Sequence, residues 1–312
     1  MIYIIGAGYM AREYAKVLQN LNTPFLVIGR GEKAVEQLKS DLAIEAVAGG
    51  LTQQIENGLA VSEYAIVCTP IDTLSDVTIE LLAFGVKKIL LEKPGALDVD
   101  ALCTIREHEV KAEAQVHVGY NRRFYQATIA LEERLKEEEL IAANFEMTEW
   151  SHLIVNEPCS DAVKQKWVLG NTSHVIDLVM YITGRFKELS SFTSGELDWH
   201  KSASRFVGAG ISERGILISY CGYWDGPGRW SAEFVTTKNR YIFRPMEKLQ
   251  VQKLGSVAVE FDTQVDYELD EKFKPGLYLQ TKAFLNDDNT KLVSIAEQID
   301  TFETYYVIAN YK

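Results

Sequence analysis

The sequence predicts an α/β domain with a parallel, doubly wound sheet, followed by an α+β domain with an open, mostly antiparallel sheet. Short apolar runs alternate with amphipathic helical patterns through residue 118. Beyond Tyr120, strand-like segments follow one another with few helices between them. A chain of 312 residues is long enough for two domains. We therefore expect one domain over residues 1–118 and a second over residues 119–312.

The first domain is predicted from five buried strands and the helices between them. The strands are expected at residues 2–5, 24–28, 64–68, 87–91 and 114–119. A helix is expected from Met10 because its apolar residues recur at helical spacing. Thr73 and Asp76 form a T-x-x-D capping signal for a second helix, which stops at Gly85. A third is expected over residues 98–110.

The second domain is predicted from runs of strands. An amphipathic helix over residues 124–135 comes first, and further helices are expected over residues 174–182 and 292–306. The strand-like stretches are 142–150, 188–195, 215–224, 230–237, 240–243 and 257–263. Such an open sheet with an exposed face favours a homo-oligomer.

Composition excludes several classes of function. A net charge of −12 argues against binding to nucleic acid or an anionic membrane, because both need a basic surface. The apolar runs are shorter than a membrane span, and the N-terminus lacks the basic segment of a signal peptide. The four cysteines are scattered, which predicts a reduced, cytoplasmic protein. We expect no metal site.

A glycine-rich turn near the N-terminus predicts a dinucleotide site. Gly6, Gly8 and Ala11 form G-x-G-x-x-A between the first strand and the first helix. Such a turn lets the backbone approach a pyrophosphate, and the free N–H groups of the helix then face the phosphates. The first domain is therefore expected to be a Rossmann domain, with Ala7, Tyr9 and Met10 also at the cofactor.

The end of the second strand favours NADP over NAD. An acidic residue there would bind the adenosine ribose of NAD, but this chain has Gly29 and Arg30. A guanidinium can bind a 2′-phosphate, although it can also stack on the adenine of either cofactor. Cys68, Thr69 and Pro70 end the "YAIVC" strand and are expected to line the cofactor site.

A charged pair at the end of a buried strand predicts the catalytic position. Glu92 and Lys93 follow "KILL" and precede Pro94 and Gly95. The carboxyl end of a parallel strand is the face where the nicotinamide would lie, and a cis Lys93–Pro94 bond would turn the lysine toward it. Lys93 could then bind a substrate hydroxyl and move its proton.

These residues together resemble a known family. "GAGYMA", "CTP", "EKPGA" and "GYNRRF" occur in this order and at these spacings in the glucose–fructose oxidoreductase/inositol dehydrogenase (Gfo/Idh/MocA) family. The likeness continues through "GNTSHVIDLVMYITG", similar to the family's helix with the catalytic histidine. Later segments are similar to members in surface-polysaccharide sugar biosynthesis, so the resemblance spans nearly the whole chain.

The resemblance implies roles for individual residues. Lys93 and His174 would be the catalytic pair. The segment 119–124 would border nicotinamide and substrate, with Asn121 at the cofactor and Tyr120 and Arg122 at the substrate. His174 and Asp177 share one helical face, so Asp177 could contact substrate, orient the imidazole or cap local backbone.

One position departs from the family pattern. Many members carry an Asp four residues before the histidine, where this chain has Gly170 followed by Asn171. Asn171 could take over substrate binding, the substrate could differ, or catalysis could be lost.

Three functions remain open from the sequence. The first is an NAD(P)-dependent oxidoreductase acting on a sugar, polyol or sugar nucleotide. The second is an NAD(P)-binding sensor or scaffold with reduced catalysis. The third is an epimerase- or glycosidase-type enzyme that uses the nicotinamide transiently.

Overall fold

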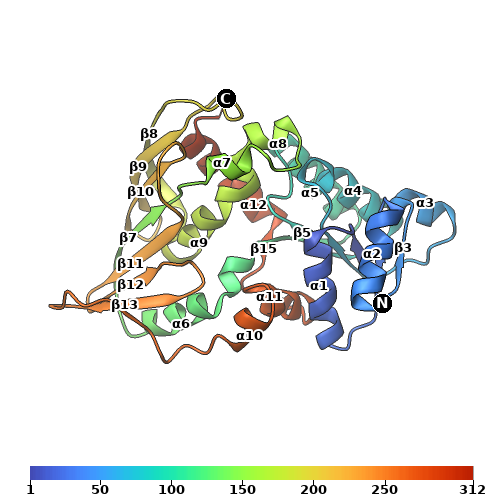
Figure 1. Cartoon of the computed structure of the whole chain (residues 1–312), viewed down its shortest axis with the longest axis horizontal. Helices are drawn as coiled ribbons and strands as arrows, with labels where there is room; N and C mark the ends of the chain where they lie inside the picture. The colour runs from blue at the N-terminus through green and yellow to red at the C-terminus, as the bar shows by residue number, and fades with distance from the viewer. Residues whose placement is uncertain (312) are drawn as a thin grey trace. The chain divides into compact units, whose positions relative to one another are not determined.

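The structure, a computed structural model, describes residues 1–311 and divides them into two compact units (Figure 1). The first unit contains Met1–Tyr120 and Leu277–Asp300, and the second contains Asn121–Gly276 and the residues from Thr301. The segment Leu277–Asp300 was expected in the second domain. It lies with the first unit because its strand β15 (Val293–Ser294) pairs with β6 (Gln115–Gly119), and its helix α11 (Leu277–Leu285) packs on α1 (Tyr9–Asn20).

The first unit is built on a seven-stranded sheet in the order β15-β6-β5-β4-β1-β2-β3. Every neighbouring pair is parallel except β15 with β6, so the predicted parallel sheet is confirmed. The remaining strands are β1 (Ile2–Ile5), β2 (Phe25–Ile28), β3 (Ala46–Val47), β4 (Tyr64–Val67) and β5 (Lys88–Glu92). The other helices are α2 (Glu32–Leu42), α3 (Gly50–Glu56), α4 (Leu74–Phe84) and α5 (Val99–Lys111).

Local sequence explains most of these boundaries. Gly85 ends α4 in the left-handed conformation, as predicted. Asp98 begins α5 and accepts a hydrogen bond from the Ala101 N–H at 2.8 Å. Thr73 is the N-cap residue of α4, as predicted, but its side chain forms no cap hydrogen bond, because its hydroxyl donates to the Pro70 carbonyl in the 3₁₀ turn over Ile71–Thr73.

The second unit contains an eight-stranded sheet in the order β14-β13-β12-β11-β7-β10-β9-β8. Its strands are β7 (Leu140–Glu146), β8 (Phe186–Ser194), β9 (Arg205–Ser212), β10 (Leu217–Tyr223), β11 (Ser231–Thr236), β12 (Asn239–Phe243), β13 (Leu249–Lys253) and β14 (Glu260–Phe261). All neighbours are antiparallel except β7 and β10, which confirms the mostly antiparallel sheet. The parallel pair is possible because helices and two further strands connect β7 to β10.

Most helices that lie wholly in the second unit are short. They are α6 (Gln126–Leu135), α7 (Ser151–Ile154), α8 (Asp161–Gln165), α9 (Ser173–Thr183) and α10 (Glu268–Lys272), with a 3₁₀ turn at Asn121–Phe124 and a π-helical turn at Val168–Thr172. The last helix, α12 (Ile295–Ala309), begins in the first unit and ends in the second. Helix α9 lies against β7 and β11, on one side of the sheet (Figure 1).

One predicted strand is much shorter than expected. Residues 257–263 were predicted as a strand, but only Glu260 and Phe261 pair, with Val251 and Gln250 of β13. Strand β14 is at the edge of the sheet with a single neighbour, and Val257 before it is almost fully exposed. An edge strand without a buried face has little apolar contact to hold a longer ladder.

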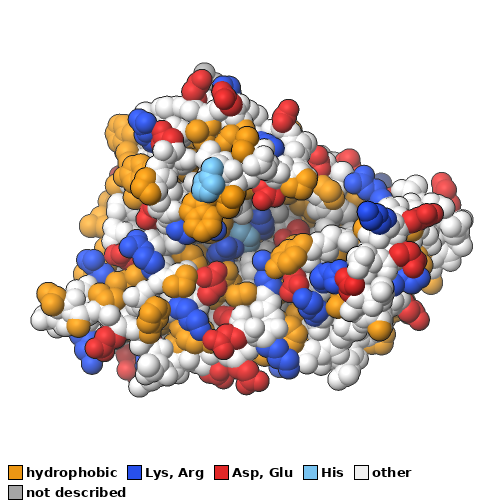
Figure 2. All heavy atoms as spheres, in the orientation of Figure 1, with side chains coloured by type: hydrophobic (Ala, Val, Ile, Leu, Met, Phe, Trp, Pro, Cys, Tyr) orange, Lys and Arg blue, Asp and Glu red, His pale blue; other side chains and the backbone are white. Residues whose placement is uncertain are grey.

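The surface carries charges of both signs. Figure 2 shows acidic and basic side chains interspersed over the face that it draws. Phe192, Leu217 and Tyr223 are large apolar side chains exposed on strands of the second sheet. Within residues 1–311, the helices are too short or too polar to cross a membrane.

Candidate functional site

A cavity of about 730 Å³ lies at the carboxyl ends of β1, β2 and β4 in the first unit. Its lining includes nine of the residues expected at a cofactor, namely Gly6, Ala7, Gly8, Tyr9, Met10, Arg30, Cys68, Thr69 and Pro70. It also includes Gly49–Thr52 at the start of α3 and Asp76 and Glu80 of α4, which sequence reasoning missed. The Gly49–Gly50 pair was the available signal, because it marks a turn.

The turn after β1 has the features that a pyrophosphate requires. Gly6 has φ +125°, and a Cβ there would lie 2.6 Å from the Cys68 carbonyl oxygen. A Cβ at Gly8 would meet no other atom within 4 Å, so this backbone is open to a ligand. Helix α1 begins at Tyr9 without a side-chain cap or an acidic residue in its first turn. Its first N–H groups and its positive dipole end therefore suit an anion.

The loop after β4 adds a hydroxyl to this cavity. The Thr69 Oγ1 is buried and has no hydrogen-bond partner among the described residues. A buried hydroxyl without a partner is costly, and a ligand group in the cavity would satisfy it. Burial raises the pKa of the Cys68 thiol well above its usual value, so this cysteine stays protonated. Together, the residues present fit a bound dinucleotide.

Arg30 follows β2 at the edge of this cavity. Its carbonyl accepts a hydrogen bond from the Gly49 N–H at 3.2 Å, which holds the backbone. Its side chain is exposed and forms no hydrogen bond or ion pair with the described residues. Gly29 is required before it, because a Cβ there would lie 2.6 Å from the Ala7 Cβ. The guanidinium is thus available to a ligand.

The end of β5 carries Glu92 and Lys93. The Tyr14 hydroxyl donates to Glu92 Oε1 at 2.7 Å, so a residue of α1 fixes the carboxylate. Burial and the Glu92 charge raise the pKa of Tyr14 well above its usual value. The Lys93–Pro94 bond is cis, and Lys93 is half-buried.

Tyr120, which is expected at the substrate, is buried in the first unit. The side chain is buried, and its hydroxyl accepts a hydrogen bond from Gln298 Nε2 at 3.1 Å. The same Gln298 nitrogen donates to the Pro94 carbonyl at 3.0 Å. Tyr120 and Gln298 therefore brace the turn that follows Lys93.

The second unit carries His174, in the first turn of α9. The imidazole is 8% exposed, and its ring centroid is 6.5 Å from that of Trp230. Arg122 stacks on the same indole at 4.8 Å, and its Nε is buried without a hydrogen-bond partner among residues 1–311. His174, Trp230 and Arg122 thus form one aromatic and cationic cluster, which the sequence predicted only in part.

Two other expected site residues are engaged by the fold. Asp177 was expected to contact substrate, orient the imidazole or cap backbone, but its oxygens accept from Arg123 Nε at 3.0 Å and Nη2 at 2.6 Å. This buried ion pair ties α9 to the turn at Asn121–Phe124. Asn121, which is expected at the cofactor, donates a hydrogen bond from its amide nitrogen to the Pro275 carbonyl at 2.8 Å.

A carboxylate that sequence reasoning missed lies beside Asn171. Glu149 follows β7, is 2% exposed and accepts hydrogen bonds at Oε1 from Asn171 Nδ2 at 3.0 Å and Thr172 Oγ1 at 2.8 Å. Burial raises the pKa of Glu149 to about 7, and the hydrogen bonds and the nearby Arg229 charge oppose the shift. The only sequence signal was an acid at the end of a strand, in "TEW".

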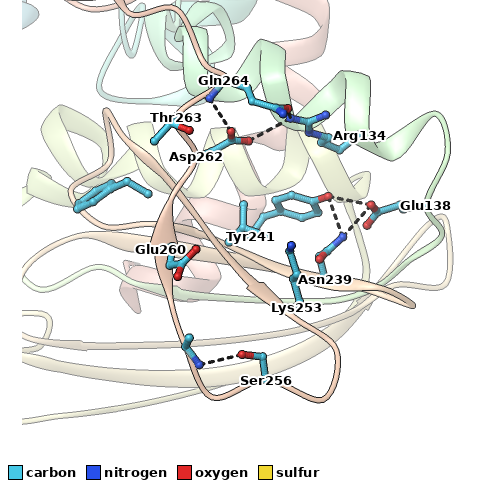
Figure 3. Close-up of a pocket in the computed structure, with 13 residues that line it drawn as sticks. Arg134, Glu138, Asn239, Tyr241, Lys253, Ser256, Glu260, Asp262, Thr263 and Gln264 are labelled. Carbon is cyan, nitrogen blue, oxygen red and sulfur yellow. Dashed lines mark hydrogen bonds and ion pairs between the residues drawn. The ribbon is translucent and has the colours of Figure 1, made fainter.

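A further cavity of about 560 Å³ lies in the second unit near β12, β13 and β14 (Figure 3). Asn239 and Tyr241 point toward Glu138 and bond to it at 2.8 and 2.9 Å. Arg134 reaches Asp262 and Gln264 on the other side. These polar groups bind one another, which indicates a structural role.

Residues 1–120 match the model of a known family. The family model GFO_IDH_MocA, described as an oxidoreductase family with an NAD-binding Rossmann fold, matches residues 1–120. Inositol 2-dehydrogenase of Rhizobium meliloti (strain 1021) is 29% identical over 127 residues, which are 39% of this chain. The match spans only 36% of that relative's length.

Solved structures share the fold over almost the whole chain at low identity. An oxidoreductase from Agrobacterium radiobacter in complex with NAD⁺, L-tartaric acid and magnesium is 13% identical with a TM-score of 0.77, over 99% of this chain and 95% of that one. The WlbA dehydrogenase from Chromobacterium violaceum, in complex with NADH and UDP-GlcNAcA, is 15% identical with a TM-score of 0.74, over 99% and 92%. UDP-N-acetylglucosamine 3-dehydrogenase from Acidithiobacillus ferrooxidans is 13% identical with a TM-score of 0.75, over 99% and 98%. The family model thus describes residues 1–120 alone, and over almost its whole length the chain shares the fold of these oxidoreductases.

Proposed function

We propose that the protein is an NAD(P)-dependent oxidoreductase acting on a hydroxyl or carbonyl carbon of a sugar, polyol or sugar nucleotide. The observation that carries the proposal is the cavity at the N-terminus of α1, with its open backbone at Gly8 and the buried Thr69 hydroxyl. The nicotinamide, when bound, supplies hydride transfer to or from the substrate carbon. The substrate class is supported by relatives whose names include inositol and UDP-sugar dehydrogenases.

Lys93 and His174 are the proposed catalytic residues. Lys93 follows β5 at the carboxyl edge of the parallel sheet, where ligands bind in such folds. Its ammonium would hold the reacting hydroxyl and exchange its proton. His174 would bind the same hydroxyl or share the proton transfer, and it is held against Trp230 in the second unit. Arg122 and Asn171 are proposed to contact the substrate.

The test of the catalytic proposal is Lys93→Met. A general acid–base group typically contributes about 10²–10⁴ in rate, so kcat should fall by that order while cofactor affinity is retained. Substrate is first identified by measuring reduction of the nicotinamide across a panel of sugars, polyols and sugar nucleotides. A Lys93→Met variant with the parent's kcat on a verified substrate would disprove the assignment.

We propose that NADP is preferred over NAD. The support is Arg30, an exposed guanidinium at the cavity after a strand that ends without a carboxylate. Arg30→Ala should weaken NADPH binding by about 10- to 100-fold, since a hydrogen bond to a charged group contributes about 1.5–3 kcal/mol. Calorimetric titration of parent and variant with NADPH and NADH measures this. Equal losses for both cofactors would show that Arg30 only stacks.

Gly170 favours a second candidate, a nucleotide-binding sensor or scaffold. It replaces the Asp that many members of the family carry at this position. Cofactor binding without turnover across the sugar panel would favour this function. A third candidate, transient nicotinamide use in an epimerisation or glycoside cleavage, would give product without net NAD(P)H formation.

We further propose a cytoplasmic homo-oligomer. Four cysteines without disulfides support a reducing location. Exposed Phe192, Leu217 and Tyr223 on the second sheet support pairing through that sheet. Light scattering coupled to gel filtration would test it, and a monomer at micromolar concentration would contradict it.

A further inference from the structure

Glu149 is a buried acid with two routes to His174. The first runs through the π-helical turn Val168–Thr172, because Oε1 accepts from both Asn171 and Thr172 and α9 begins directly after them. A carboxylate that accepts hydrogen bonds from two adjacent side chains of a turn holds the last residues of that turn in position. That end is the start of α9, which carries His174 in its first turn.

The second route runs through Arg229, in the connection between β10 and β11. Its Nη1 is 3.6 Å from Glu149 Oε2, and its guanidinium lies over the Trp230 ring at 5.0 Å. Trp230 in turn contacts the His174 ring at 6.5 Å between centroids. The guanidinium also stacks on Trp150 at 4.7 Å, which holds it in place. A change in the charge of Glu149 would therefore act on two groups next to His174. One is the Asn171–Thr172 turn before it, and the other is the Arg229–Trp230 pair beside it.

We propose that Glu149 is a positioning residue for the reaction, which holds the Asn171–Thr172 turn and the Arg229–Trp230 pair around His174. The inference rests on the proposed function, since it assigns His174 a part in catalysis. An acid at this position costs folding free energy, because a carboxylate that is 2% exposed loses much of its hydration. The stability of the fold is therefore no reason for an acid here. Hydrogen bonds and the Arg229 charge recover part of this loss, which is the arrangement expected of a group retained for its charge.

Glu149 also brings a titration near neutrality to this cluster. Burial raises its pKa to about 7, and the described charged group that faces it is Arg229. Below that pH the acid is protonated, and Oε1 and Oε2 accept less strongly from the turn and from Arg229. We therefore expect the hold on His174 to tighten as pH rises through about 7.

The first experiment needs no substrate. The His174 imidazole titration is followed by NMR in the full-length parent, Glu149→Gln, Glu149→Asp and Glu146→Gln. Because Glu149 becomes charged only as pH rises through about 7, it favours the imidazolium over the upper part of the His174 titration, and Glu149→Gln should lower the His174 midpoint. Glu149→Asp should restore most of it. Glu146→Gln, on the same segment at the end of β7, should leave it unchanged. An unchanged midpoint in Glu149→Gln would overturn the proposal.

The second experiment links the same variants to turnover. With a substrate from the sugar panel, Glu149→Gln should lower kcat by about tenfold or more, because a misplacement of about 1 Å in a catalytic group can cost about 10²-fold. NADPH affinity should stay at the parent value, and the step near pH 7 in the kcat profile should disappear. A kcat profile identical to the parent's would show a structural role only and refute the inference. If the NMR shift is found but the parent turns over no substrate, the coupling stands and the proposed function fails.

Discussion

His200 is held neutral inside the second unit by a chain of hydrogen bonds. It is 0% exposed, and its Nδ1 lies 2.7 Å from the Ala203 carbonyl oxygen. Its Nε2 lies 2.9 Å from the Tyr311 hydroxyl, which itself accepts from the Val168 N–H at 3.0 Å. The tautomer with a proton on Nδ1 satisfies every one of these groups. A second proton on Nε2 would remove the acceptor of Tyr311 and bury a charge.

The size of the effect follows from the pKa. Burial lowers the pKa of His200 from 6.5 to about 4. The folded value lies below the unfolded one, so this stability is complete above pH 6.5 and is lost as pH falls toward 4. At about 1.4 kcal/mol for each pH unit, the full loss is about 3 kcal/mol.

The perturbation is His200→Gln, which removes the titration. At pH 7 the variant should be less stable than the parent by about 1–3 kcal/mol, the cost of a disturbed buried hydrogen bond. The difference should shrink as pH falls from 6.5 toward 4, because only the parent must take up the unfavourable proton. His152→Gln is the matched control, since His152 is exposed.

The assay is urea unfolding from pH 8 to pH 4.5, followed by tryptophan fluorescence. This signal reports on the second unit, which contains all five tryptophans, Trp150, Trp167, Trp199, Trp224 and Trp230. A difference in the free energy of unfolding between parent and His200→Gln that stays constant over this range would refute the argument.

Three further substitutions test the site and its supports. Gly8→Val should weaken NADPH binding, measured by calorimetry, at an unchanged melting temperature, because a Cβ there meets no protein atom; a loss of stability would contradict this. Gly6→Ala should instead lower the melting temperature, because its Cβ would clash with the Cys68 carbonyl in a left-handed region that costs about 1–3 kcal/mol; an unchanged value would count against the geometry. Asp177→Ala should cost about 3–5 kcal/mol in urea unfolding because it removes one charge of a buried ion pair, and a loss below 1 kcal/mol would contradict this.

The sequence predicted the first unit well because its signals are local. Apolar runs of four to six residues between helical patterns predicted β1, β2, β4, β5 and β6 to within one residue at each end. The glycine turn gave the cofactor cavity, since Gly6 and Gly8 act through backbone shape and need no distant partner. The position of Lys93 at the end of β5 followed from the strand pattern alone. The two-residue β3 was missed because so short a strand has no periodicity to detect.

Tertiary structure decided what each polar group does. Asp177 shares a helical face with His174 in sequence, but a partner 54 residues away in sequence, Arg123, takes both its oxygens. In the sequence, Glu149 is an acid at the end of a predicted strand. In the structure it is buried, and it accepts hydrogen bonds from Asn171 and Thr172. Burial and charge depend on residues far apart along the chain, and no spacing within a short segment encodes them. The sequence alone determined the parallel strands, the glycine turn and the placement of the lysine, whereas long-range packing determined which acids are buried and which groups they bind.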